Sequence, residues 1–124
     1  MFVRRAMQLG GAGLVAVLAA CGGGGGGGNN PPQIPPVTPT MNVAVVNNDF
    51  TPPNAGIATG NTVTWTWNSG GVQHNIAWAG GPTPLPAGSG AKDAGTYQAT
   101  FNNAGTYHYV CSLHSNMEGY VTVQ

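Results

Sequence analysis

Short runs of alternating apolar and polar residues dominate the sequence from residue 41 onward. The clearest run is 61–67, where Val63, Trp65 and Trp67 alternate with threonines. A period of two places such apolar side chains on one face of a β-strand. Five further runs show strand character: 41–46, 73–78, 96–101, 106–111 and 120–124. Since no segment longer than a turn has a helical period, we predict an all-β fold, an antiparallel sandwich or barrel.

Turn-forming residues separate these runs. Clusters of Gly, Asn, Ser and Thr occur at 54–56, 59–61, 68–71 and 102–105. Such clusters mark turns between strands. The stretch 80–95 is rich in Gly and Pro, and we expect it to be a long loop. The predicted domain is therefore built of short strands, and about 84 residues leave room for only a small core.

The first twenty residues resemble an export signal. Arg4 and Arg5 precede an apolar run, 9–20, that is too short and too rich in glycine to form a stable membrane span. The run ends in Leu-Ala-Ala directly before Cys21, which resembles the lipobox of bacterial lipoproteins. In such proteins the cysteine is lipidated and becomes the new N-terminus. We therefore predict a lipoprotein signal at 1–20 and a membrane anchor on Cys21, with an ordinary export signal as the alternative.

Residues 21–40 are predicted to be a linker. Seven consecutive glycines follow Cys21, and residues 29–40 contain five prolines. A glycine coil is flexible and a proline-rich chain is stiff and extended, and neither can bury a core. The predicted organisation is a signal peptide at 1–20, a linker at 21–40 and a β domain at 41–124. The domain would then be exported and tethered on the periplasmic or outer side of a bacterial membrane.

Charged residues are scarce, at 5% of the chain. Without the signal, Lys92 is the one Lys or Arg, against Asp49, Asp93 and Glu118. So few charges provide no electrostatic surface for nucleic acid or for anionic lipid headgroups. We expect no nucleic-acid partner, membrane attachment through acyl chains alone, and a monomer.

Four side chains form a candidate metal site. Cys111, His114 and Met117 lie within seven consecutive positions, and His74 lies upstream in the run 73–78. Ser and Asn residues after Cys111 indicate a tight return loop. Such a loop would bring the side chains of Cys111, His114 and Met117 to one point. A thiolate, two imidazoles and a weak thioether are the ligands of a blue copper centre. Each residue alone could be a buried thiol, core filler or a hydrogen-bonded histidine, but together they favour one copper ion.

The region around these residues resembles a known family. The segment 105–123, Gly-Thr-Tyr-His-Tyr-Val-Cys-Ser-Leu-His-Ser-Asn-Met-Glu-Gly-Tyr-Val-Thr-Val, resembles the copper-binding signature of cupredoxins in the plastocyanin/amicyanin group. Its Cys-x-x-His-x-x-Met spacing is that of the short ligand loop of amicyanin. The upstream segments 48–52, 60–65 and 74–75 also resemble this group in order and spacing, so that the resemblance covers about 41–124.

The resemblance implies a Greek-key β-sandwich or barrel of about seven to eight strands. It also implies that His74, Cys111 and His114 form a plane around copper, with Met117 as the axial ligand. Asn75 matches the asparagine that braces the cysteine loop in this family. One difference is Leu113, which stands where many relatives have proline.

This ligand set predicts a mononuclear copper protein that acts as a membrane-tethered one-electron carrier between redox partner proteins. Copper storage or delivery by the same ligands is the alternative. An enzyme is not expected, because multicopper oxidases and copper nitrite reductases need additional histidine clusters. The chain has three histidines, and two of them are already assigned to the candidate site. We expect the third, His108, to point outward, because it alternates with two tyrosines in the run 106–111.

Overall fold

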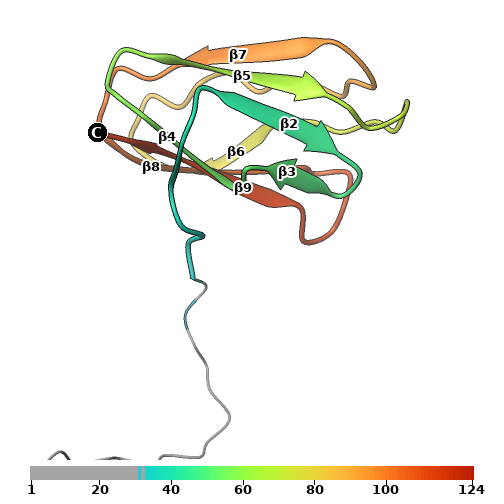
Figure 1. Ribbon diagram of the computed structural model, residues 1–124, viewed down its shortest axis with the longest axis horizontal. Helices are drawn as coiled ribbons and strands as arrows, with labels where there is room; N and C mark the ends of the chain where they lie inside the picture. Colours follow the sequence, from blue (N-terminus) through green and yellow to red (C-terminus); the bar gives the residue numbers. More distant parts are fainter. Residues whose placement is uncertain (1–30, 32) are drawn as a thin grey trace, which may run out of the picture. The chain divides into compact units, whose positions relative to one another are not determined.

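The computed structural model describes residues 31 and 33–124, and these residues form a two-sheet β-sandwich (Figure 1). The first sheet contains, in spatial order, β1 (Thr38–Pro39), β4 (Asn54–Ile57), β9 (Glu118–Val123), β8 (Gly105–Val110) and β6 (Ala77–Gly80). The second contains β3 (Asp49–Thr51), β2 (Asn42–Val46), β5 (Thr62–Trp67) and β7 (Thr96–Thr100). This confirms the predicted all-β sandwich. No helix in the described part of the chain is long and apolar enough to cross a membrane.

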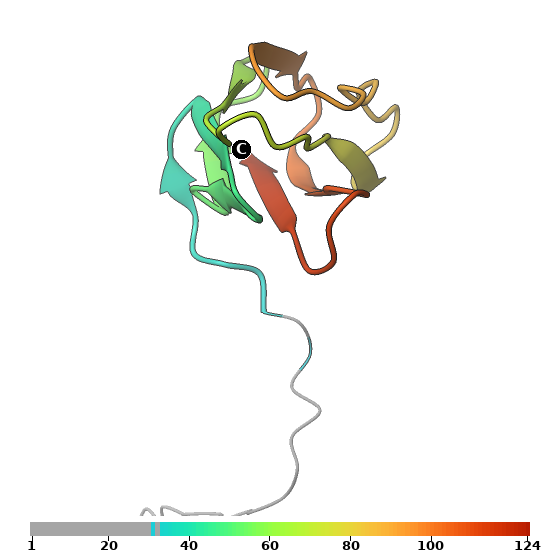
Figure 2. The ribbon, with the colours of Figure 1, turned by 90° about the vertical axis from the view of Figure 1, so that its right-hand side faces the viewer.

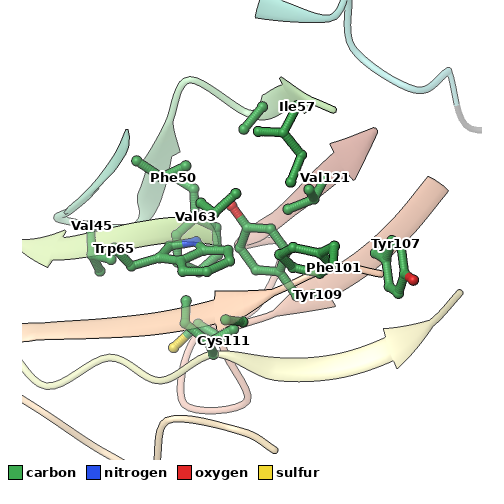
Figure 3. Packing of buried hydrophobic residues seen from close by; sticks show 14 of the residues in the cluster. Val45, Phe50, Ile57, Val63, Trp65, Phe101, Tyr107, Tyr109, Cys111 and Val121 are labelled. Atoms are coloured by element: carbon green, nitrogen blue, oxygen red, sulfur yellow. The ribbon is translucent and has the colours of Figure 1, made fainter. Parts of the chain in front are cut away.

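The core lies between the sheets and is rich in aromatic side chains. Trp65 on β5 and Tyr109 on β8 are fully buried, and their rings meet edge to face with centroids 5.5 Å apart. Phe50 on β3 meets the same tyrosine at 4.8 Å. Figure 3 shows Cys111 in this cluster, beyond the end of β8. The thiol of Cys111 therefore belongs to the same buried core as these aromatic side chains.

The strand directions differ from the antiparallel arrangement predicted from sequence. The pairs β2–β5, β4–β9 and β1–β4 are parallel, so that both sheets are mixed. Alternation identifies a strand and its buried face, but it contains no information about the direction of the neighbouring strand. The antiparallel prediction is therefore wrong for these three pairs.

A second correction concerns residues 54–56, which we expected to form a turn. They belong to β4, and the side chain of Asn54 is fully buried. Its Nδ2 donates to the carbonyl of Pro35 at 2.9 Å, and its Oδ1 accepts from the hydroxyl of Thr122 at 2.9 Å. These two bonds satisfy the amide, so a residue typical of turns can occupy a buried strand position.

The sheet also includes part of the predicted linker. Thr38 and Pro39 form β1 beside β4, and the N–H of Thr40 donates to the carbonyl of Gly56 at 3.2 Å. The sheet therefore begins before residue 41. The predicted signal peptide, Cys21 and the glycine tract lie outside the described residues.

The region around His74 is less regular than predicted. The expected strand at 73–78 is replaced by β6, which begins at Ala77, and His74 makes an isolated bridge to Lys92. The predicted loop at 80–95 begins at the end of β6 and lies beside this strand at one side of the sandwich (Figure 2). The candidate ligand His74 is thus held by a loop contact rather than by a continuous sheet.

Candidate metal centre

Three of the four predicted ligands converge from two distant parts of the chain. His74 precedes β6, and Cys111 and His114 follow β8. One ligand atom of each lies within 4.8 Å of the others. The Sγ atom of Cys111 lies 3.4 Å from Nδ1 of His114 and 3.9 Å from Nδ1 of His74. The fold therefore aims one sulfur and two ring nitrogens at a common point.

Met117 closes the loop that begins at Cys111. The strands β8 and β9 pair antiparallel up to Val110 and Glu118, and the N–H of Cys111 donates to the carbonyl of Met117 at 2.9 Å. Asn116 has a φ of 61°, a left-handed conformation that asparagine tolerates better than most residues. Met117 is 2% exposed, which places its side chain in the core with Cys111.

The two imidazoles differ in their surroundings. His74 is fully buried, whereas His114 is only partly buried, and their ring centroids lie 4.5 Å apart. Burial and, to a smaller extent, the charge of His114 lower the pKa of His74. The ring of His74 is therefore neutral near pH 7, the form in which a nitrogen lone pair is free for a metal.

Asn75 braces the cysteine loop. Its Nδ2 donates to the hydroxyl of Ser112 at 2.8 Å, and its Oδ1 accepts from the N–H of Ser112 at 2.8 Å. This pair of bonds links the residue after His74 to the residue after Cys111. The role that the family resemblance implied for Asn75 is present, whereas the partner hydroxyl of Ser112 had no signal in the sequence.

The geometry fits a single metal ion of the first transition row. Bonds of about 2.0 Å to nitrogen and 2.3 Å to sulfur, at an angle of about 120°, would hold the two ligand atoms roughly 3.7 Å apart. The two sulfur–nitrogen distances, 3.4 and 3.9 Å, lie on either side of this value. A soft thiolate with two imidazoles, together with a methionine buried in the same cluster as the thiol, suits copper better than zinc.

The third histidine lies away from this site. His108 faces outward on β8, where its Nε2 lies 2.8 Å from a carboxylate oxygen of Glu118. Its ring stacks on that of Tyr120, with centroids 4.7 Å apart. The predicted outward orientation of His108 is therefore confirmed.

The fold and the site together define a small copper-binding β-sandwich. Residues 39–124 match the family described as copper binding proteins, plastocyanin/azurin family. This chain therefore belongs to the plastocyanin/azurin family of cupredoxins, and its cofactor is copper.

Similar proteins include an amicyanin and a plastocyanin. Amicyanin-alpha of Methylorubrum extorquens is 34% identical over 84 residues, which are 66% of this chain and 70% of that protein. Plastocyanin of Scenedesmus fuscus is 36% identical over 87 residues, 60% of this chain and 86% of that protein.

Similar solved structures include a cupredoxin and a copper-containing nitrite reductase. A purple cupredoxin from Nitrosopumilus maritimus has a TM-score of 0.59 and 30% identity over 67% of this chain and 98% of its own. A copper-containing nitrite reductase from Thermus scotoductus has a TM-score of 0.61 and 26% identity over 70% of this chain. The match spans only 22% of that reductase chain.

Proposed function

We propose that this protein is a mononuclear type 1 copper protein that carries single electrons between redox partner proteins. His74, Cys111 and His114 would be the equatorial ligands and Met117 the weak axial ligand. The convergence of the thiol and two imidazole nitrogens within 4.8 Å carries this proposal. When bound, copper supplies the Cu(II)/Cu(I) couple.

The surroundings of the site suit electron transfer because they restrict ligand movement. Cys111 is 3% exposed and lies in the aromatic core, and its loop is closed by its own N–H bond to Met117. The Asn75–Ser112 bonds fix the other side of the loop. A site whose ligands hardly move between the two oxidation states needs little reorganisation for each electron transferred.

His114 is the proposed port for electrons. It is partly exposed, and its neighbour Leu113 is 50% exposed. Since charges are scarce in the domain, partner proteins would dock mainly on an uncharged surface around these two residues. This proposal does not include an enzymatic activity.

Electrochemistry distinguishes an electron carrier from a protein that stores or delivers copper. We expect the copper-loaded protein to give a reversible one-electron wave in voltammetry, and to retain its copper for hours when a Cu(I) chelator is present. The reason is that the buried thiol and His74 are shielded from solvent. Transfer of copper to the chelator within seconds, with an irreversible wave, would contradict the carrier proposal and favour delivery.

We further propose that the protein is exported and anchored to a bacterial membrane through lipid on Cys21. The lipobox-like residues before Cys21 and the glycine tract after it support this proposal. The expected result of Cys21→Ser is a shift of the protein from the membrane fraction to the soluble fraction, because acyl chains would be its attachment. Fractionation with immunodetection measures this shift, and equal membrane association of both proteins would exclude the lipid anchor.

A further inference from the structure

The backbone around His74 is held by a loop rather than by a sheet. The pairing of β6 with β8 begins at Ala77, three residues after His74. The N–H of His74 donates to the carbonyl of Lys92, and the N–H of Lys92 donates to the carbonyl of His74, both at 2.9 Å. The indole N–H of Trp67 adds a bond of 3.2 Å to the same His74 carbonyl. Both backbone groups of the proposed ligand are therefore engaged outside the sheets.

Ser89 holds the next buried residue of this segment. Its hydroxyl accepts from the N–H of Ile76 at 2.8 Å, and its own N–H donates to the carbonyl of Ile76 at 3.0 Å. The hydroxyl also donates to the carbonyl of Gly90 at 2.8 Å. Ile76 is 1% exposed, so its N–H cannot readily take water in place of this hydroxyl.

The opposing segment is itself fixed to the sandwich. The hydroxyl of Tyr97 on β7 donates to the carbonyl of Ala87, and the indole N–H of Trp78 donates to that hydroxyl at 3.3 Å. Gly88 lies against the carbonyl of Ile76, because a β-carbon at this glycine would be only 2.8 Å from that oxygen. The segment 87–92 is therefore tied both to the core and to the backbone of His74.

The imidazole of His74 lacks the support that metal-binding histidines usually have. Such a ring normally donates its second nitrogen to a carbonyl or carboxylate, which fixes the orientation of the ring. The Nε2 atom of His74 is buried and has no hydrogen-bond partner among the described residues. The position of Nδ1 therefore depends on how firmly the backbone of His74 is held.

We propose that residues 87–92 act as a clamp that positions His74 for copper, with Ser89 as the key positioning residue. This inference rests on the proposed function, in which His74 is a copper ligand. The clamp replaces a bond to the ring by four backbone contacts to His74 and Ile76. Its chemistry is specific, because the Ser89 side chain must both accept a hydrogen bond from Ile76 and donate one to Gly90.

Hydrogen exchange in the copper-free protein tests the clamp directly. In Ser89→Ala, we expect the amide of His74 to exchange about tenfold faster, because a buried N–H at Ile76 loses its acceptor and the clamp opens as a unit. Ser89→Thr keeps the hydroxyl and should restore slow exchange. Thr59→Ala is a matched control. Thr59 lies in the turn between β4 and β5, and its hydroxyl donates to the carbonyl of Gln124, so this variant also deletes one hydroxyl bond to a carbonyl. Unchanged exchange at His74 in Ser89→Ala would overturn the clamp.

Copper loss gives a second readout. We expect Ser89→Ala to release copper to a chelator about tenfold faster than the parent, and Ser89→Thr and Thr59→Ala to release it at the parent rate. If the parent itself binds no copper, the proposed function fails. If the parent and Ser89→Ala release copper equally slowly, only the clamp fails. If Ser89→Ala does not fold, Gly88→Ala tests the clamp instead, because its β-carbon would push against the carbonyl of Ile76. Hydrogen exchange and copper release at the parent rates in Gly88→Ala would overturn the clamp.

Discussion

Replacing Cys111 with serine is expected to abolish the intense visible absorption of the oxidised, copper-loaded protein. That absorption would come from charge transfer between a cysteine thiolate and Cu(II). A serine hydroxyl is not deprotonated near neutral pH and is a hard ligand, so it cannot supply this transition. We expect a loss of more than tenfold in the absorbance of the band, measured by titrating the copper-free protein with Cu(II).

Comparing the absorption band of the parent with that of Cys111→Ser requires that the variant folds, and it requires a control variant in the same loop. Serine is close to cysteine in volume, so Cys111→Ser should retain the sandwich, which far-ultraviolet circular dichroism can verify. Ser115→Ala changes an exposed hydroxyl four residues further on and should retain the band. A band of parent intensity in folded Cys111→Ser would remove the thiolate from the proposed site.

Gly119→Val is expected to destabilise the copper-free protein by about 3 kcal/mol, because it overfills a tightly packed part of the core. Gly119 on β9 is directly opposite Tyr109 on β8, and a β-carbon there would overlap the Cζ and Oη atoms of that tyrosine. Tyr109 cannot move freely, because it is fully buried against Phe50 and Trp65. Its burial also raises the pKa of the phenol, so the hydroxyl stays neutral in the core.

Chemical denaturation monitored by tryptophan fluorescence measures the free energy of unfolding of this variant. Gly80→Ala is the matched control, because Gly80 is on β6 of the same sheet and a β-carbon there has no neighbour within 4 Å. We expect the control to remain within about 0.5 kcal/mol of the parent. A Gly119→Val protein as stable as the control would show that Tyr109 does not pack over Gly119.

The sequence was most informative where one strand face is apolar. Val63, Trp65 and Trp67 are all buried, as their alternation predicted. It was misleading at Asn54, because the buried position of this residue depends on Pro35 and Thr122, which are distant in sequence. Strand direction was mispredicted for a related reason, since it depends on which strands become neighbours and not on local pattern.

In the candidate site, too, features set by local sequence could be predicted, and features set by contacts between distant residues could not. Cys111, His114 and Met117 could be grouped from sequence because one short loop contains them. His74 was added from a separate upstream run, 73–78. The proposed clamp could not be predicted, because three of its four contacts are backbone bonds, between His74 and Lys92 and between Ser89 and Ile76, across an irregular loop. Ser89 lies between two glycines, in a segment where apolar and polar residues do not alternate, so its role had no signal in the sequence.

X-ray absorption at the copper edge, on protein loaded with one equivalent of copper, tests the central claim most directly. We predict one copper ion bonded to a single short sulfur and two imidazole nitrogens, as the convergence of Cys111, His74 and His114 requires. Coordination by nitrogen and oxygen alone, such as the outward-facing His108 and Glu118 would provide, would contradict the proposed copper site.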